Sequence, residues 1–266
     1  MYRKGIQNMQ DLSEKSLLPT KIAWITGGGS GIGRSLALAL DELGCKVLIS
    51  GRNKERLEAT AKQAGQQNVQ SVPLDVTNPV AVIQTVDSIL EQHGRIDLAF
   101  LNAGDYTPMK LNDFDSKLFH RLMNTNYLGV VNCLAALLPD MRSRHAGEIL
   151  ITASLSGYCG LPGAAPYGAS KAALINLAES LHPELIREGV TLRLINPGFV
   201  STDLTDKNEF KMPSLISPEE AAEEIMKSLP SRCFEIRFPT GFALVMKLIK
   251  FLPYRLYFAL MRRFLK

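Results

Sequence analysis

Short apolar runs alternate with longer segments whose apolar residues recur at helical spacing along the first 238 residues. Short β-rich runs are typical of strands, and apolar positions at i, i+3, i+4 and i+7 are typical of amphipathic helices. The pattern predicts strands over 21–26, 46–50, 69–74, 97–101, 147–153, 191–196 and 233–238. It predicts helices over 31–43, 53–63, 78–93, 116–144, 165–188 and 218–229.

This alternation predicts βαβ units, and therefore an α/β fold with a single Rossmann-type, doubly wound parallel sheet and helices on both faces. We expect that domain to cover residues 21–238, after a polar N-terminal extension over 1–20. Residues 239–266 are predicted to form an amphipathic helical tail with basic and apolar residues. Ligands of such sheets bind beyond the carboxyl ends of the strands, so we sought site residues there.

Composition narrows the partners without changing the fold. Hydrophobic residues make up 46% of the 266 residues and charged residues 21%, which is ordinary for a globular protein. The net charge of +4 is small, and the first 230 residues hold no dense Lys/Arg tract with aromatics, so no nucleic-acid partner is predicted. No uncharged apolar run approaches the roughly 20 residues that span a bilayer. No apolar stretch follows Arg3 and Lys4, so no signal peptide is predicted and the expected location is cytoplasmic.

Cysteine and histidine spacing predicts neither disulfides nor a metal site. None of the cysteines forms a C-x-x-C pair, which favours reduced thiols in a reducing compartment. The histidines are scattered and lack the spacing of metal ligands. These residues are Cys45, Cys133, Cys159 and Cys233, and His93, His120, His145 and His182.

A glycine-rich segment, TGGGSGIG over residues 26–33, lies between the first predicted strand and helix. Gly27 would permit the tight turn, Gly31 the approach of backbone to a pyrophosphate, and Gly33 the close packing of helix on strand. The helix N-terminus then offers free N–H groups and a positive dipole to phosphates. Flexible loops also collect glycine, but the strand before and the helix after favour a dinucleotide site.

The second predicted strand ends in Ser50-Gly51-Arg52. NAD-selective sites place an acidic residue about 20 residues after the glycine motif to bind the ribose 2′-hydroxyl. Here that place holds Gly51, and the guanidinium of Arg52 suits a 2′-phosphate. The alternative is that Arg52 only begins a solvated helix with Lys54 and Arg56. We therefore predict NADP(H) as the cofactor, mainly on Arg52.

Ser154, Tyr167 and Lys171 are candidates for acid–base chemistry. Tyr167 and Lys171 are four residues apart on one predicted helix and share a face. A phenol has a pKa near 10, and a nearby ammonium together with a positive nicotinamide would favour its ionised form. Ser154 ends the fifth predicted strand, where it could donate to a carbonyl oxygen. A Tyr-x-x-x-Lys pair is usually a surface pair, so its position after the fifth strand carries the interpretation.

Together these residues resemble the short-chain dehydrogenase/reductase family over roughly residues 20–230. Two departures are Leu101, where the family usually has Asn, and Ser30, where some NADP-using relatives carry a basic residue. The matching residues are the segment 26–33, Asp75, Asn102-Ala103-Gly104, Asn126, Ser154, Tyr167-Gly-Ala-Ser-Lys171, Pro197-Gly198 and Thr202.

The resemblance implies a role for each catalytic residue. Tyr167 would be the general acid in reduction and the general base in oxidation. Lys171 would lower the pKa of Tyr167 and bind the nicotinamide ribose, and Ser154 would polarise the substrate carbonyl. Asn126 would hold a water that links Lys171 to solvent as a proton relay. Its alternative is a satisfied core amide.

The resemblance also implies a cofactor-binding set. Asp75 would contact the adenine edge, Asn102 and Gly104 would line the cofactor floor, and Thr202 would orient the carboxamide. Asp75 could instead cap a helix, and Thr202 could cap a turn. The full set is Thr26, Gly27, Gly29, Ser30, Gly31, Ile32, Gly33, Ser50, Arg52, Asp75, Val76, Asn102, Ala103, Gly104, Tyr167, Lys171, Pro197, Gly198, Val200 and Thr202.

Apolar residues dominate the segments expected near the substrate. This favours a lipophilic small molecule, such as a 3-oxoacyl, sphingoid-base or steroid-like ketone, unless these residues only pack the loops. Residues 203–217 are expected to form a mobile lid over the site. The apolar residues are Met109, Tyr158, Leu161, Phe199 and Phe210.

The tail, residues 240–266, mixes large apolar residues with Lys247, Lys250, Arg255, Arg262 and Arg263, and Pro253 divides it into two short helices. Three interpretations stay open: an interfacial anchor giving peripheral membrane contact, a cover for the pocket mouth, or a subunit contact. A homodimer or homotetramer is expected.

The sequence thus predicts an NADP(H)-dependent oxidoreductase that interconverts a carbonyl and an alcohol by hydride transfer. The alternative is a nucleotide-binding redox sensor of the same fold without significant turnover. A sensor need not keep Asn126, Ser154, Tyr167 and Lys171 together, and this chain has all four.

Overall fold

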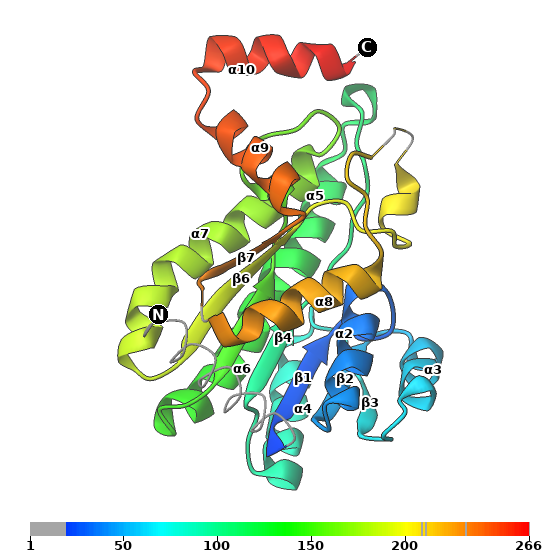
Figure 1. The fold of residues 1–266 in the computed structure, drawn as a ribbon, viewed down its shortest axis with the longest axis vertical. Coiled ribbons are helices and arrows are strands. Elements are labelled where there is room, and N and C mark those ends of the chain that lie inside the picture. The colour runs from blue at the N-terminus through cyan, green and yellow to red at the C-terminus, as the bar shows by residue number, and fades with distance from the viewer. Residues whose placement is uncertain (1–19, 209, 211, 232, 266) are drawn as a thin grey trace, which may run out of the picture.

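A parallel seven-stranded sheet forms the centre of the computed structural model, which describes residues 20–208, 210, 212–231 and 233–265 (Figure 1). The strand order is β3-β2-β1-β4-β5-β6-β7, and each neighbouring pair is parallel. The predicted doubly wound fold is confirmed. The strands are β1 (Ile22–Thr26), β2 (Lys46–Gly51), β3 (Val69–Pro73), β4 (Leu98–Leu101), β5 (Glu148–Thr152), β6 (Thr191–Pro197) and β7 (Glu235–Phe238).

Helices cover both faces of the sheet. On one face the core is filled from α4, α6, α7 and α9, and on the other from α2, α3 and α8. Neighbouring residues of β1 alternate between the two cores, with Trp24 in the first and Ile25 in the second, as expected for a strand buried on both sides. The helices are α2 (Gly31–Glu42), α3 (Lys54–Gln63), α4 (Pro79–His93), α5 (Ser116–Met123), α6 (Gly129–Ser143), α7 (Ala165–Arg187), α8 (Pro218–Ser228), α9 (Thr240–Lys250) and α10 (Tyr254–Met261).

The helix predicted over 116–144 is divided in the structure. A π-helical turn over Asn124–Leu128 separates α5 from α6. Such turns insert a residue into the α-helical repeat and often lie at functional sites. Here the turn carries Asn126, whose buried side chain bonds to Asp105 and Ser170 from other segments. Tertiary contacts therefore accompany the interruption, and helical periodicity alone could not predict it.

The buried guanidinium of Arg193, on β6, ties the last strand to the sheet. It donates to Glu148 at 2.8 Å, to the Cys233 carbonyl at 2.7 Å and to the Ser228 carbonyl at 2.8 Å. A buried charge is tolerated when it is paired and fully hydrogen-bonded in this way. These contacts fix how the chain enters β7.

The tail forms α9 and α10 at the top of Figure 1, where α10 lies further from the sheet than α9. α9 buries Ala243 and Met246 in the core, and Tyr257 of α10 donates a hydrogen bond to the Gly160 carbonyl. No helix in the described ranges is long and apolar enough to cross a membrane. The predicted extension over 1–20 lies, except for Thr20, outside the described residues.

Candidate active site

The glycine segment forms a tight turn between β1 and α2. Gly27 has a φ of +74°, and a Cβ there would come within 3.0 Å of the Ala103 backbone. A Cβ at Gly33 would lie 2.3 Å from the Gly27 carbonyl oxygen, so the start of α2 can approach the turn only with glycine here. Ser30 caps α2 with its extended backbone rather than with its side chain. The first N–H groups of α2 therefore point toward any anion at the turn.

A groove of about 210 Å³ lies beside this turn. The groove is lined by residues at or just after the carboxyl ends of β1, β2, β3 and β4. An α/β sheet binds its ligand at this edge. The predicted residues that line the groove are Gly27, Gly29, Ser30, Arg52, Asp75, Val76, Ala103 and Gly104. Six further lining residues were not among the predicted ones: Gly51, Asn53, Arg56, Leu57, Leu74 and Thr125.

Several predicted cofactor residues support the groove from inside. Ser50 is buried, its Oγ accepts from Trp24 Nε1 at 2.9 Å, and its carbonyl accepts from the Gly27 amide at 2.7 Å. Thr26 Oγ1 accepts from the amides of Asn102 at 3.0 Å and Ala103 at 3.1 Å. These bonds hold the ends of β1, β2 and β4 in register. Ile32, in the first turn of α2, packs against the core.

Asp75 takes part in a local turn. Its Oδ1 accepts from the Thr77 amide at 2.9 Å and from the Thr77 hydroxyl at 2.8 Å. Asp75 is not the helix cap, because Asn78 caps α4, and Asp75 lines the groove. The adenine contact therefore stays a prediction.

The loop after β6 lies against the glycine turn. A Cβ at Gly31 would meet the Thr202 methyl group at 2.9 Å, and Asp203 pairs with Arg56 Nη1 of α3 at 2.5 Å. Thr202 also accepts from Thr205 Oγ1 through its carbonyl at 2.9 Å, so it belongs to a turn as well. Pro197 ends β6, Gly198 donates to the Phe238 carbonyl, and buried Val200 pairs with Ile216. The predicted segment 197–202 thus reaches the glycine turn through Thr202, and its contact with the cofactor stays a prediction.

Ser154, Tyr167 and Lys171 come together at the carboxyl end of β5. Ser154 follows β5, and its side chain forms a hydrogen bond with the Tyr167 phenol. Lys171 is 3% exposed, and its Nζ donates to the Thr152 carbonyl at 2.8 Å. Nζ lies 5.6 Å from the centre of the Tyr167 ring, and a Cβ at Gly104 would lie 3.6 Å from it. The groove and the candidate acid–base group are therefore adjacent.

Burial dominates the proton affinities of this group. It raises the pKa of Tyr167 to about 12, against the lowering effect of the hydrogen bond with Ser154. Burial also lowers the pKa of Lys171 to about 8. The predicted lowering of the Tyr167 pKa by Lys171 stays a prediction, because burial alone dominates here and opposes ionisation of the phenol. At pH 7 Tyr167 is neutral and Lys171 is mostly protonated.

Asn126 is fully engaged by its neighbours. Its Oδ1 accepts from the Asp105 amide at 2.7 Å. Its Nδ2 donates to the Asp105 carbonyl and to Ser170 Oγ, both at 2.9 Å. The side chain thus matches the core-amide alternative and joins the loop after β4 to α7. The proton relay stays a prediction.

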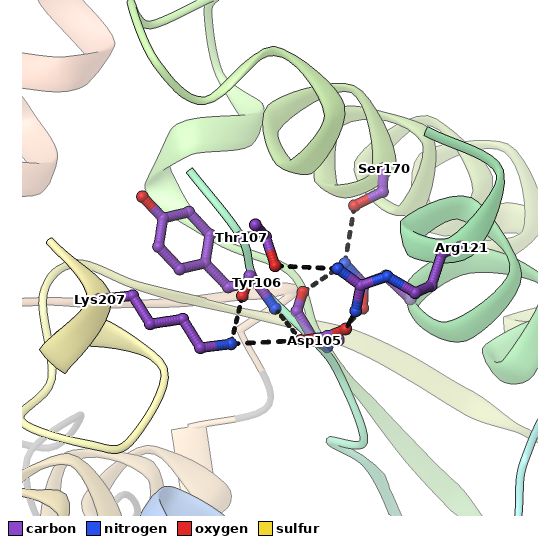
Figure 2. A network of polar contacts seen from close by, with 7 residues as sticks. Asp105, Tyr106, Thr107, Arg121, Ser170 and Lys207 are labelled. Atoms are coloured by element: carbon purple, nitrogen blue, oxygen red, sulfur yellow. Dashed lines mark hydrogen bonds and ion pairs between the residues drawn. The ribbon is translucent and has the colours of Figure 1, made fainter. Parts of the chain in front are cut away.

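Asp105 is the centre of a polar network that was not predicted from the sequence (Figure 2). Its carboxylate pairs with Arg121 of α5 and lies 3.6 Å from Lys207 Nζ. Lys207 also donates to the Tyr106 carbonyl at 2.6 Å. The signal that could have found Asp105 is its position directly after Asn102-Ala-Gly at the end of β4.

Tyr106 links this network to the candidate acid–base group. Its ring meets the Tyr167 ring edge-on, with centres 4.9 Å apart, and its hydroxyl donates to Asn208 Oδ1 at 2.7 Å. Lys207 and Asn208 belong to the predicted lid over 203–217, so the network attaches part of that segment to the site. The mobility of the lid stays a prediction.

The apolar residues expected at the substrate end fall into two groups. Phe199 contacts Phe210 and Phe242, with ring centres 5.7 Å apart in each pair. Met109 is buried, and Leu161 packs against the core. The Phe242 contact was missed, because this residue belongs to the tail.

Tyr158, which we expect near the substrate, belongs to a polar cluster around Glu235. It is buried, and its hydroxyl donates to Glu235 Oε1, which also accepts from Asn196 at 2.8 Å. Glu235 Oε2 accepts from Lys247 at 2.5 Å and from Arg237 at 3.1 Å. Burial and the bond to Glu235 raise the pKa of Tyr158. Burial opposes ionisation of Glu235, but its hydrogen bonds, led by that of Lys247, lower its pKa overall.

Within the described residues, no group of three or more His, Cys, Asp or Glu side chains could hold a metal ion. Burial raises the pKa of the Cys45 thiol to about 11 and that of Cys133 to about 12, so both thiols are protonated at neutral pH.

Comparison with known proteins gives consistent matches. Residues 21–212 match the family model described as short chain dehydrogenase. An uncharacterized oxidoreductase of Myxococcus xanthus is 36% identical over 245 residues, which are 91% of this chain and 97% of the relative.

Two solved structures are similar in fold and sequence. A short chain dehydrogenase/reductase from Burkholderia phymatum, in complex with NAD, is 27% identical, with a TM-score of 0.77 over 86% of this chain and 92% of that one. An alcohol dehydrogenase from Thermococcus sibiricus, complexed with 5-hydroxy-NADP, is 28% identical, with a TM-score of 0.74 over 82% of this chain and 95% of that one.

Proposed function

The chain belongs to the short-chain dehydrogenase family of oxidoreductases, and from that premise we propose that it interconverts a carbonyl and an alcohol with NADP(H). One observation carries the proposal: Ser154, Tyr167 and Lys171 lie together beside a groove that begins at a helix N-terminus. The residues present fit a dinucleotide, because side chains at Gly27 and Gly33 would fill the turn where its phosphates bind. A bound nicotinamide cofactor would supply or accept the hydride.

The chain's own residues would handle the proton and the substrate oxygen. In reduction, Ser154 and Tyr167 donate hydrogen bonds to the carbonyl oxygen, and Tyr167 passes its proton to that oxygen as the alcohol forms. In oxidation, Tyr167 takes the proton back. The Lys171 ammonium, held by the Thr152 carbonyl, stabilises the phenolate that remains. Asn126 holds the loop after β4 and α7 at their present separation.

The preference for NADP(H) rests on the rim of the groove beyond β2. Arg52 and Arg56 both line it, and Gly51 stands where an acidic residue would repel a 2′-phosphate. The two similar structures contain NAD and 5-hydroxy-NADP, so the family accommodates either cofactor. Gly104, Asn102, Thr202 and the turn at 26–33 complete the proposed cofactor site.

The test is to follow NADPH and NADH oxidation with 3-oxoacyl thioesters, steroid ketones and sphingoid-base ketones. We expect turnover with a higher kcat/KM for NADPH, and a shift toward NADH in Gly51→Asp/Arg52→Ser. A wild type that prefers NADH would contradict the role of Arg52. Tight NADPH binding without turnover of any ketone would favour the redox-sensor alternative.

The proposal includes a lipophilic substrate, and the contacts of Phe199 with Phe210 and Phe242, in segments expected near the substrate, support it. We also propose a cytoplasmic location, because the cysteine spacing predicts reduced thiols. Residues 240–266 would give the enzyme peripheral contact with a membrane. The proposal also includes a homodimer or homotetramer, which light scattering of the purified protein would identify.

A further inference from the structure

Seven exposed large apolar side chains lie on α9, α10 and their connection. Leu248 is 61% exposed, Phe251 79% and Tyr254 77%, and Leu244, Val245, Leu256 and Phe258 are also exposed. We call these seven residues the tail surface. Leu244, Leu248 and Phe251 follow one another at helical spacing, while Ala243 and Met246 face the core. Contiguous exposed apolar residues mark an interaction site.

The charges around the tail surface are all of one sign in the sequence. Residues 240–266 contain six Lys or Arg and no Asp or Glu. Arg255, Arg262 and Arg263 are exposed beside the apolar side chains. Basic residues together with exposed Phe, Tyr and Leu suit the boundary between headgroups and acyl chains of an anionic bilayer. In a symmetric dimer the same cationic patch would face its own copy, so charge complementarity favours lipid as the occupant.

The tail surface is held in place rather than free to fold back. Lys247 bonds to Glu235, and Tyr257 bonds to the Gly160 carbonyl. Ala243 and Met246 fill the core beneath α9. The body of the protein thus binds the inner side of α9 and α10 and leaves the side chains of the tail surface exposed.

The root of the tail reaches the candidate active site. Phe242, in the first turn of α9, contacts Phe199, which contacts Phe210 of the predicted lid. A Cβ at Gly198 would lie 3.1 Å from Phe242, so the helix packs directly on the segment expected to border the cofactor. Three aromatic rings therefore join the end of β6 to the base of the tail surface.

We propose that the tail surface docks on an anionic bilayer and that the Phe242–Phe199–Phe210 contact forms one wall of the path by which a lipid substrate enters. This inference rests on the proposed oxidoreductase activity and specifies its substrate class. The substrate is a membrane-resident alkyl chain that carries its carbonyl or hydroxyl group near one end. The chain stays in apolar surroundings while that group reaches Tyr167.

Binding is tested by flotation of the full chain with vesicles of phosphatidylcholine and phosphatidylglycerol, and with vesicles of phosphatidylcholine alone. We expect binding to the anionic vesicles that falls with added salt. Leu248→Asp/Phe251→Asp should weaken binding at least tenfold. Ile83→Asp, which changes a 48% exposed apolar residue of α4, is the matched control and should bind like the wild type. Unchanged melting temperatures would show that each variant folds.

Turnover is then compared between a long-chain ketone in the anionic vesicles and a short water-soluble ketone, both with NADPH. The tail variant should lose most activity on the vesicle ketone and keep its activity on the soluble one. Wild type that does not float with anionic vesicles would overturn docking. A tail variant that becomes monomeric, without any vesicle binding by the wild type, would assign the surface to a second copy instead. Failure on both ketones with normal flotation would count against the proposed function, not against docking.

Discussion

Two tyrosine–lysine pairs lie at the same end of the protein in different electrostatic surroundings. Tyr167 and Lys171 contact the Ser154 hydroxyl and the Thr152 carbonyl. Tyr158 and Lys247 both bond to the carboxylate of Glu235, and Lys247 Nζ lies 5.7 Å from the centre of the Tyr158 ring. The residue types are the same, but only the second pair includes a carboxylate in its hydrogen bonds.

This difference separates a candidate acid–base group from a structural link. Glu235 takes the phenolic hydrogen bond of Tyr158 and the charge of Lys247, so ionising Tyr158 would put two anions together. In the first pair, a neutral hydroxyl and a carbonyl leave the ammonium available to a developing phenolate. The neighbours of a tyrosine and a lysine, more than their proximity, therefore decide what chemistry the pair can perform.

The largest expected difference between the pairs is in turnover. Tyr167→Phe should lower kcat by about 10²–10⁴-fold, the usual contribution of a positioned acid–base group, and leave NADPH binding intact. Tyr158→Phe, the matched change in the other pair, should keep kcat near that of the wild type. Steady-state kinetics and NADPH fluorescence titration measure both. A Tyr167→Phe enzyme with more than about a tenth of wild-type kcat would remove Tyr167 from this role.

Lys171→Met should lose activity but gain stability at neutral pH. Burial lowers the folded-state pKa of Lys171 to about 8, below its ordinary value, so the charged form is destabilising in the folded protein. This cost is fully present below pH 8 and disappears as the pH rises through the range from 8 to the ordinary value near 10.4.

We expect the variant to unfold with a free energy about 1–3 kcal/mol higher at pH 7, after allowing for the lost bond to Thr152. The gain should shrink toward pH 10. Urea unfolding at several pH values measures it. Lys247→Met, which breaks the bond to Glu235, should lower stability instead. A destabilised Lys171→Met at pH 7 would contradict the burial argument.

Glu235→Gln removes the charge of the carboxylate that bonds to both members of the second pair. The change should lower the free energy of unfolding by about 1–2 kcal/mol at pH 7, because Lys247 loses its charged partner, while kcat is retained. The pKa of Glu235 is lowered in the folded state, so its contribution is present at neutral pH and is lost as the pH falls through that pKa. The difference from wild type should therefore narrow in acid. A large loss of kcat would mean that this pair also supports catalysis.

The smallest expected effect concerns Tyr106, the ring that touches Tyr167. Tyr106→Phe keeps the edge-on contact and removes only the bond to Asn208, so stability should fall by about 0.5–1.5 kcal/mol. Thermal unfolding of this variant, compared with Tyr106→Ala, separates the hydroxyl from the ring. An equal effect of both variants would show that the ring does not support Tyr167.

Local spacing made much of the fold and part of the site predictable. Residues close together in the sequence determine three such features: the alternation of strands and helices, the turn at 26–33 and the Tyr167–Lys171 spacing. The π turn at 124–128 was not predictable, because Asn126 bonds to Asp105 and Ser170 from distant segments.

The second tyrosine–lysine pair could not be predicted from the sequence either, because its contacts join distant segments. Tyr158 precedes Glu235 by 77 residues, and in sequence Tyr158 resembles a pocket residue while Lys247 resembles part of a solvated helix. Contacts between such residues depend on the order of strands in the sheet. Asp105 lies between these two cases. Its contacts are with distant residues, but its position directly after Asn102-Ala-Gly could have identified it as a site residue.

The position of α9 and α10 after β7 affects the order in which the protein can fold during synthesis. Chains emerge from the ribosome at about 5–20 residues per second, and early segments must wait for partners that come later. β1 cannot pair with β4 until more than 70 further residues have been synthesised. α9 and α10 follow β7 directly, and their anchors, Glu235 and Gly160, have already been synthesised. The tail surface is therefore translated after the residues that orient it.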